Sequence, residues 1–195
     1  MSMSKVNGAT QVTNYRFLNM FELDVTLKDG SPSKWMMASR AKSAEKLKCN
    51  AETVTADAVA VFAIGVMNNK GCMVLIRQFR FPIGDYVYEL PAGLVDEGET
   101  LAHAAQRELK EETGLDMAVC HVTAPYFSSV GMTDETCSLV YGIYTGTPSL
   151  KGQERAEDIE VVFADVEECQ RILREEKVCM RTAMAIRSFL DMAEE

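Results

Sequence analysis

The sequence predicts an α/β fold, a sandwich with a mixed sheet between helices, preceded by an N-terminal antiparallel β-hairpin. Two observations support this prediction. Apolar stretches with the period of strands occur on both sides of one amphipathic helical segment, and two more helical segments follow them. Strands interspersed with helices that each bury one face commonly form such layered folds. A chain of 195 residues is long enough for one domain with a complete core and a small appendage.

The first strands are expected near the N-terminus. Residues 16–40 alternate in a strand-like way on both sides of the turn KDGSPS, where Gly30 and Pro32 favour a reversal of the chain. This pattern predicts a β-hairpin. Residues 42–50 are polar and are expected to form a linker to the rest of the chain.

The strands of the main sheet are expected to begin after this linker. Residues 58–67 and 72–78 are apolar runs separated by NNKG, which predicts a second hairpin. A short strand, YVYEL, ends at Leu90. Three further strands are expected at residues 118–122, 136–144 and 159–164, and two amphipathic helices at 166–176 and 179–192.

The segment 101–113 is predicted to be a helix with a signal at each end. Thr100 can cap its N-terminus, and Gly114 stands where helices commonly stop. Apolar residues four apart form one stripe along it, namely Leu101, Ala105 and Leu109.

Composition argues against several classes of protein. The formal net charge of −9 disfavours a nucleic-acid or anionic-membrane binder, because such proteins present a basic face. No apolar run approaches the roughly 20 residues needed to span a bilayer. The six cysteines form no CxxC pair and the N-terminal residues lack the apolar segment of a signal peptide, so we expect reduced thiols and a cytoplasmic protein. With only two histidines, a histidine-based zinc site is not expected.

Three carboxylates crowd one part of the predicted helix. Glu108 and Glu112 are four residues apart and share a face, and Glu111 lies beside them. The simplest interpretation is a solvated acidic face, but the preceding loop PAGLVDEGE contains glycines that allow close backbone approach to a ligand. Carboxylates on a rigid helix are suitable ligands for Mg²⁺ or Mn²⁺, and Mg²⁺ is commonly shared with substrate phosphates.

The segment that contains these carboxylates resembles the Nudix box, G-x5-E-x7-R-E-U-x-E-E-x-G-U, at every specified position. The fixed residues are Gly93, Glu99, Arg107, Glu108, Glu111, Glu112 and Gly114, and the apolar ones are Leu109 and Leu115. The resemblance implies a Nudix α/β/α sandwich that hydrolyses a nucleoside diphosphate linked to another moiety, with a divalent metal.

The resemblance also implies roles for single residues. Glu108 and Glu112 would be the main metal ligands, assisted by Glu111 and by the carbonyl of Ala92. Arg107 would hold the carboxylates in place and, with Glu111, belongs to the expected catalytic set. Glu99 would brace the loop.

The sequence on both sides of the box resembles the ADP-ribose pyrophosphatase branch over most of the chain. Within QFRFPIGDYVYELPAG, Arg80 matches an arginine that contacts the pyrophosphate, and Glu89 matches a polar residue that lines the pocket. The alternative for Arg80 is a surface ion pair.

The loop SSVGMTDE resembles the loop of that branch that follows the box. Glu135 takes the place of the glutamate that handles the attacking water and is the expected general base; Gly131 is expected to contact substrate. Glu135 could instead be a plain strand-edge carboxylate, with Asp134 as its nearest competitor. Val130 stands where many relatives have proline.

Trp35 and Arg40 match a W-x4-R segment of an N-terminal sheet that pairs with a second subunit in that branch. The resemblance implies that Trp35 stacks on adenine and that Arg40 reaches the phosphates across a homodimer, roles for which an indole and a guanidinium are well suited. Trp35 could instead serve ordinary packing. Phe17 and Phe21 are candidates for a second stacking aromatic ring.

We therefore expect residues 1–55 to form a β-hairpin region for dimerisation and part of the substrate site, and residues 56–195 to form the Nudix hydrolase domain. An apolar hairpin edge that pairing would cover supports the homodimer. The expected activity is cleavage of ADP-ribose to AMP and ribose 5-phosphate. UDP- or GDP-sugars are alternative substrates, and a non-catalytic module that senses ADP-ribose is an alternative of another class.

Overall fold

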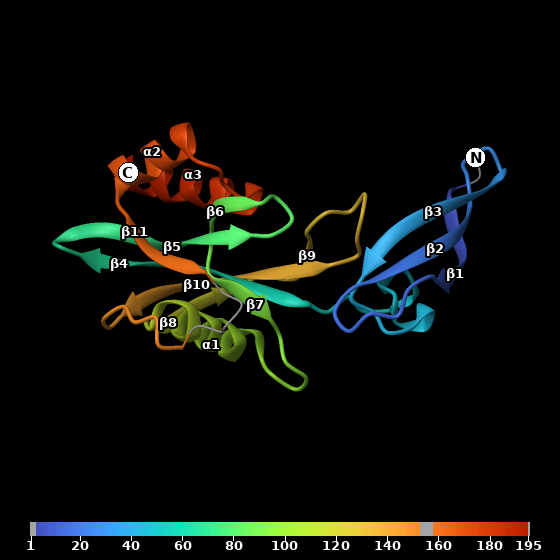
Figure 1. Cartoon of the computed structure of the whole chain (residues 1–195), viewed down its shortest axis with the longest axis horizontal. Coiled ribbons are helices and arrows are strands. Elements are labelled where there is room, and N and C mark those ends of the chain that lie inside the picture. Colours follow the sequence, from blue (N-terminus) through green and yellow to red (C-terminus); the bar gives the residue numbers. More distant parts are fainter. Residues whose placement is uncertain (1–2, 153–157, 195) are drawn as a thin grey trace. The chain divides into compact units, whose positions relative to one another are not determined.

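The computed structural model describes residues 3–152 and 158–194 of the chain (Figure 1). Within it the chain forms two compact units. The first unit contains the residues up to Asp57 together with Pro125–Cys137, and the second contains Ala58–Ala124 and the residues from Ser138 onward.

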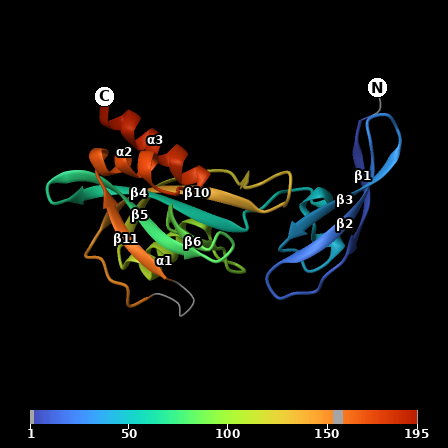
Figure 2. The same ribbon diagram turned by 45° about the horizontal axis from the view of Figure 1, so that its top comes forward.

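The first unit contains a three-stranded antiparallel sheet in the order β1-β2-β3 (Figure 2). Strands β2 (Asn19–Thr26) and β3 (Pro32–Ser39) form the predicted hairpin, with Gly30 at a φ of 90° in the turn. Strand β1 (Lys5–Gln11) was not predicted from the sequence. Its residues, KVNGATQ, are largely polar and include no run of alternating apolar side chains, so only pairing with β2 reveals it.

A small core holds the first unit together. It consists of the buried side chains Phe21, Leu23, Met37 and Leu47. Leu47 lies between two short 3₁₀ turns, η1 (Ala44–Lys46) and η2 (Lys48–Asn50), and has no exposed surface. The expectation that residues 42–50 form a mere linker is therefore wrong, because one apolar residue in this polar stretch anchors it. Phe21 is also fully buried, which removes it as a candidate for stacking on a base.

The segment from Pro125 to Cys137 belongs to the same unit. It contains the short strand β9 (Tyr126–Phe127), which pairs with Thr136 and Cys137 at the start of β10. The Ala38 N–H of β3 donates to the Met132 carbonyl at 2.8 Å, and the Lys48 N–H donates to an Asp134 carboxylate oxygen at 3.0 Å. These bonds fix the loop that contains Glu135.

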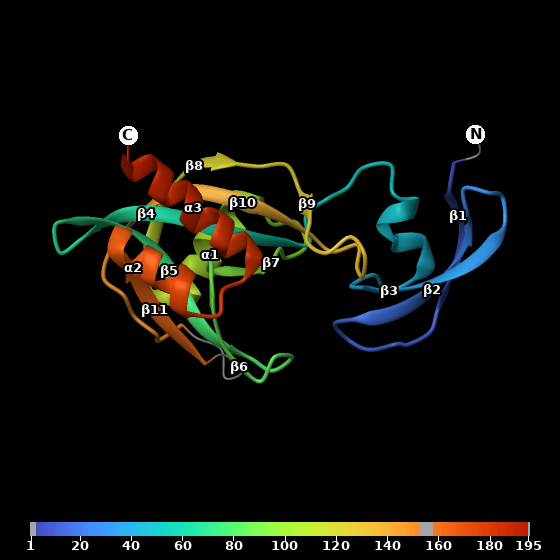
Figure 3. The ribbon, with the colours of Figure 1, turned by 90° about the horizontal axis from the view of Figure 1, so that it is seen from above.

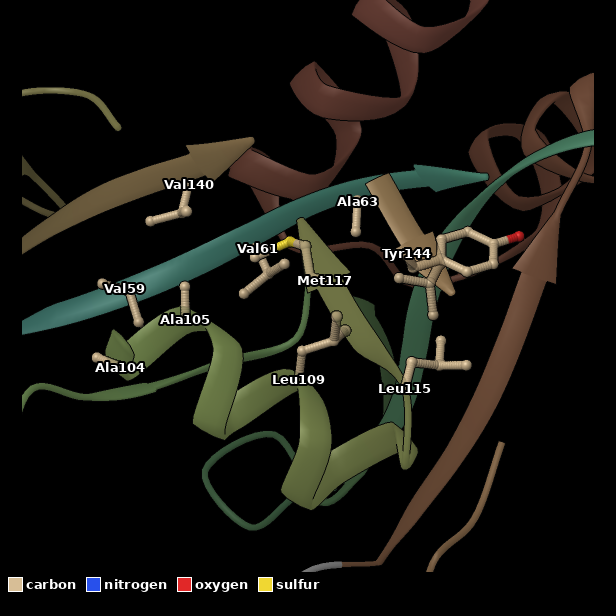
Figure 4. Packing of buried hydrophobic residues seen from close by; sticks show 11 residues of the cluster. Val59, Val61, Ala63, Ala104, Ala105, Leu109, Leu115, Met117, Val140 and Tyr144 are labelled. Atoms are coloured by element: carbon tan, nitrogen blue, oxygen red, sulfur yellow. The ribbon is translucent and has the colours of Figure 1, made fainter. Parts of the chain in front are cut away.

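The second unit is built on a large mixed sheet whose main strand order is β11-β5-β4-β10-β8. Strand β6 pairs with β5, and β7 pairs with β4. Figure 4 shows β4 and β10 running in the same direction, from Val59 to Ala63 and from Val140 to Tyr144, whereas β4 and β5 are antiparallel. The strands are β4 (Ala58–Met67), β5 (Lys70–Arg80), β6 (Asp85–Glu89), β7 (Ala92–Leu94), β8 (Asp116–Val122), β10 (Thr136–Thr145) and β11 (Ile159–Ala164).

Helices cover both faces of this sheet. Figures 1 and 3 show α1 (Leu101–Thr113) on one face and α2 (Val166–Glu175) with α3 (Met180–Glu194) on the other. The arrangement confirms the predicted α/β/α sandwich. Ala105 and Leu109 of the apolar stripe are fully buried in the core between α1 and the sheet (Figure 4). In the described residues, no helix combines the length and the apolar composition that crossing a membrane requires.

Candidate active site

Both ends of α1 are fixed by the residues that the sequence singled out. The Thr100 hydroxyl oxygen accepts a hydrogen bond from the His103 N–H at 3.2 Å and caps the N-terminus. Gly114 ends the helix in the left-handed conformation, with a φ of 76°. A Cβ atom on Gly114 would also lie 2.5 Å from the Ser149 nitrogen, so only glycine fits there. The box carboxylates therefore project from a helix whose register is well defined.

Arg107 offsets the repulsion between the box carboxylates. Its Nη1 donates to Glu108 at 2.6 Å and to Glu111 at 3.1 Å. Its Nε and Nη2 donate to the two carboxylate oxygens of Glu99 at 3.0 and 2.9 Å, and Nη2 also donates to the Leu94 carbonyl at 2.9 Å. One guanidinium thus joins the loop before the helix to two of the acidic side chains on the helix.

The electrostatics of Glu99 follow from this bidentate pair. The hydrogen bonds from Arg107 lower the pKa of the Glu99 carboxyl from 4.5 to about 2, although burial acts in the opposite direction. The same bonds raise the pKa of Arg107. Glu99 is only 8% exposed, so water screens the pair weakly. The predicted bracing role of Glu99 is consistent with this geometry.

Gly93 packs directly against Glu108. A Cβ atom on residue 93 would come within 2.1 Å of the Glu108 carboxylate carbon, far inside any real contact distance. The fixed glycine at the start of the box therefore leaves the space that the Glu108 carboxylate occupies. Gly93 lies in β7, next to Ala92, so the strand and the helix meet at this carboxylate.

Glu112 is a buried carboxylate on the same helix, 3% exposed. It accepts a hydrogen bond from the Ala92 N–H at 3.0 Å. The sequence assigned the carbonyl of Ala92 to the metal, and the structure places this residue beside Glu112 through its N–H. Glu108 and Glu112 therefore both lie where α1 faces β7, whereas Glu111 is 46% exposed.

The donor set of this cluster fits a hard divalent cation. Carboxylate and carbonyl oxygens are the ligands that Mg²⁺ and Mn²⁺ prefer, and the space that Gly93 leaves lets one of them sit against the backbone. As the side chains stand, no three acidic, histidine or cysteine side chains among the described residues converge into a metal site. Arg107 and the Ala92 N–H engage the oxygens that a cation would bind.

Arg80, which is predicted to contact the pyrophosphate, pairs with Glu89, which is predicted to line the pocket. The Arg80 Nε and Nη2 donate to the two Glu89 oxygens at 2.7 and 2.9 Å. Glu89 is 7% exposed and Arg80 is 41% exposed, so the pair joins a buried carboxylate to an accessible guanidinium. The hydrogen bonds that Arg80 donates to Glu89 raise the pKa of Arg80, with a smaller contribution from the charge of Glu112. The pair therefore lies within electrostatic range of the box.

Arg181 joins this pair and was not predicted from the sequence. Its Nη2 lies 3.7 Å from a Glu89 oxygen, and its side chain is 33% exposed. The residue lies in the first turn of α3, far along the chain from the box. One signal could have indicated it: a cation at a helix N-terminus is electrostatically unfavourable and suggests a nearby anion.

The remaining predicted residues belong to the first unit. Arg40 Nε and Nη2 both lie 2.7 Å from Glu135 Oε1, so the expected phosphate ligand and the expected general base form an ion pair. Glu135 is 27% exposed, and the carboxylate of its competitor Asp134 accepts from the Lys48 N–H. Glu135 therefore pairs with a side-chain cation, whereas Asp134 accepts a backbone hydrogen bond.

Trp35 is 55% exposed and is not a core residue of the first unit. It lines a cavity of about 330 Å³ together with Gly131, as well as Met37, Phe127 and Met132. The cavity is largely apolar, with Lys48 and Asp134 as its charged residues. Its size and lining suit a flat ring.

Comparison with known protein families supports the resemblance of the segment from Gly93 to Leu115 to the Nudix box. The family model for the NUDIX domain matches residues 56–184. The chain therefore belongs to the NUDIX domain family, and the resemblance seen in the sequence is confirmed. Nudix hydrolases generally require a divalent metal ion.

Several individual proteins are similar to this chain. A putative nudix hydrolase 2 of Caenorhabditis elegans is 37% identical over 117 residues, which span 57% of this chain and 52% of the relative. An ADP-ribose pyrophosphatase of Bacillus subtilis is 26% identical over 93% of this chain and 90% of its own length. A crystal structure of an ADP compounds hydrolase has a TM-score of 0.69 at 17% identity, covering 99% of this chain and 97% of that one, and shows the same fold.

The matched region thus spans only about half of the C. elegans relative, and 40% of a mouse ADP-sugar pyrophosphatase that is 37% identical over 87 residues. The family and the fold apply to this chain directly.

Proposed function

We propose that this chain is a metal-dependent Nudix hydrolase that cleaves the diphosphate of ADP-ribose, giving AMP and ribose 5-phosphate, or of related nucleoside diphosphate sugars. The observation that carries the proposal is the meeting of α1 and β7, where Gly93 and Arg107 hold Glu108 and the Ala92 N–H holds the buried Glu112. The names of the Bacillus and mouse relatives support an ADP-linked substrate.

Glu108 and Glu112 would hold a divalent cation, assisted by Glu111 and the carbonyl of Ala92. We favour Mg²⁺, with Mn²⁺ as a substitute, because all these donors are oxygen atoms. When bound, such a cation supplies charge neutralisation for the diphosphate and lowers the pKa of a bound water.

The protein's own groups have three further tasks. Arg107 keeps the acidic side chains in place, so that little reorganisation is needed as charge develops. Arg80, held by Glu89, binds a diphosphate oxygen. Glu135 accepts the proton of the water whose oxygen attacks phosphorus, and the bridging P–O bond breaks.

Residues of the N-terminal region complete the proposal. Trp35 stacks on the base and Arg40 contacts phosphate, and the chain acts as a homodimer in the cytoplasm. The exposure of Trp35 and its place in a largely apolar cavity support the stacking role. Light scattering at micromolar concentration tests the dimer, and a monomer there would refute it.

A product assay tests the function. The purified protein is incubated with Mg²⁺ and separately with ADP-ribose, UDP-glucose, GDP-mannose, NADH or diadenosine polyphosphate, and products are identified by mass spectrometry beside a Glu112→Gln variant. We expect AMP and ribose 5-phosphate to form fastest from ADP-ribose, and kcat to fall by at least ~10² in the variant, the scale for removing one preorganised stabilising group. A variant within threefold of wild type would refute the metal assignment.

Other outcomes would change the proposal. Faster cleavage of UDP-glucose or GDP-mannose would leave the proposed diphosphate hydrolysis in place but change the preferred substrate. Binding of ADP-ribose without cleavage of any compound would make the protein a sensor.

A further inference from the structure

The beginning of α3 is fixed to the end of β6 by three hydrogen bonds. The Tyr88 N–H donates to the Lys177 carbonyl at 2.9 Å, and the Cys179 N–H donates back to the Tyr88 carbonyl at 3.1 Å. The Leu90 N–H donates to the hydroxyl of Thr182, which is fully buried, at 2.9 Å. Because these bonds bracket Glu89 on one side and Arg181 on the other, the register of α3 places Arg181 beside Glu89.

Arg181 is near Glu89 but is not hydrogen-bonded to it. Arg80 takes both Glu89 oxygens at 2.7 and 2.9 Å, whereas Arg181 stays at 3.7 Å from one of them. Two guanidiniums therefore share one buried carboxylate, whose single negative charge balances only one of them. The Arg181 Nε atom is buried and has no hydrogen-bond partner in the part of the chain that the structure describes.

The N-terminus of α3 adds to this positive potential. Arg181 is in the first turn of α3, where the helix dipole also contributes positive charge. The negative charge of Glu112 in the box also acts on Arg80, which indicates that the arginine pair lies near the acidic cluster. An accessible pair of guanidiniums next to the box carboxylates is the arrangement that a diphosphate oxygen recognises, since planar guanidinium groups bind phosphate bidentately.

We propose that Arg181 is a further substrate-binding residue, which together with Arg80 forms a two-guanidinium site for the diphosphate of a nucleoside diphosphate. Glu89 orients Arg80 in this site and leaves the charge of Arg181 for the ligand. The inference deepens the proposed function and rests on it for the identity of the substrate, but its test does not need turnover.

The test measures binding of α,β-methylene-ADP, a nucleoside diphosphate that cannot be cleaved between its phosphates, by calorimetry in the presence of Mg²⁺. Three variants are compared with wild type: Arg181→Gln, Arg181→Lys and Arg187→Gln. Arg187 is the matched control, because it is an exposed arginine on the same helix and its loss changes the net charge equally. Thermal unfolding of each variant accompanies the binding measurement.

We expect Arg181→Gln to weaken binding about tenfold or more, the scale for losing a hydrogen bond to a charged group. Arg181→Lys should recover part of the lost affinity, because lysine keeps the positive charge but lacks the planar group that binds phosphate through two hydrogen bonds. Arg187→Gln should stay within twofold of wild type. The difference between Arg181→Gln and wild type should shrink as salt is raised, since screening weakens exposed charges most.

Several results would overturn the inference. They are wild-type affinity in Arg181→Gln, an equal loss in Arg187→Gln, or no binding of the probe to wild type. A fall in melting temperature without a fall in affinity would leave Arg181 a structural residue only. If Arg181→Gln leaves ADP-ribose hydrolysis unchanged, the inference is refuted and the proposed function stands. If binding of the probe depends on Arg181 but the protein hydrolyses no nucleotide, the proposed function is refuted and the inference stands.

Discussion

Gly93 and the carboxylate of Glu108 occupy adjoining space, so that a Cβ atom on residue 93 would lie 2.1 Å from the carboxylate carbon. The glycine is therefore needed for what it lacks, and not for an unusual backbone angle: its φ is not among the positive values in the chain. Any side chain at this position must push a proposed metal ligand out of place. The first prediction follows from this contact.

Gly93→Ala should lower kcat on the preferred substrate by at least ~10², because a displaced ligand removes a preorganised charge. The Mg²⁺ concentration for half-maximal rate should also rise. Gly71→Ala is the control, since a Cβ atom there would meet nothing within 4 Å. Equal rates for the two variants would show that the Glu108 carboxylate can move without consequence.

The lowered pKa of Glu99 leads us to predict that the stability of the fold depends on pH. Its pKa is lowered to about 2 by Arg107, so its pair contributes stability above pH 4.5, its ordinary pKa, and loses that contribution as pH falls from 4.5 towards 2. We expect Glu99→Gln to lower the free energy of unfolding at pH 7 by an amount that shrinks as the pH falls through this range. Urea titrations at several pH values measure it. Glu97→Gln, at an exposed position of the same loop, should cost less and show no such trend.

Glu135 and Asp134 can be separated by kinetics. If Glu135 is the general base, Glu135→Gln should lower kcat by ~10² to 10⁴ and change KM little. Asp134→Asn should keep most of kcat, because Asp134 instead accepts a backbone hydrogen bond from Lys48. Circular dichroism controls for folding. The reverse order of the two effects would transfer the role of base to Asp134.

The core under α1 makes a prediction about stability alone. Leu109 has no exposed surface and packs between the helix and the sheet. Leu109→Ala should lower the free energy of unfolding by roughly 2–5 kcal/mol, the range for such cavities. The control is Lys110→Ala, at the next residue of the helix, whose side chain is exposed. Its free energy of unfolding should stay within about 0.5 kcal/mol of wild type. Similar urea midpoints for both variants would contradict the packing described here.

Local signals in the sequence predicted α1 to the residue. Thr100 and Gly114 act through hydrogen bonds and a φ angle that depend only on their near neighbours, so the bounds of the helix could be inferred without the fold. The same holds for the turn between β4 and β5. Asn68 and Asn69 adopt φ angles of 52° and 62°, which asparagine tolerates better than most residues.

Contacts between distant residues could not be predicted in this way. Nothing near Arg181 in the sequence indicates Glu89, and the polar strand β1 has no periodicity that marks it before β2 is beside it. In the first unit, the burial of Leu47 could not be predicted either, since a single apolar residue in a polar stretch gives no periodic pattern. The box itself predicted the position of the acidic cluster on α1, whereas the residues around Glu89 depend on how β6 and α3 pair.

The bonds between β6 and α3 also bear on the order of folding. They link Leu90 to Thr182 across 92 residues, and contacts at such separations close large loops and tend to form late. The capped α1 helix depends mainly on neighbours in sequence. A chain that has emerged from the ribosome only as far as α1 would therefore present the acidic side of the site without its second arginine. We expect competence to hold a nucleotide to arrive only when α3 docks.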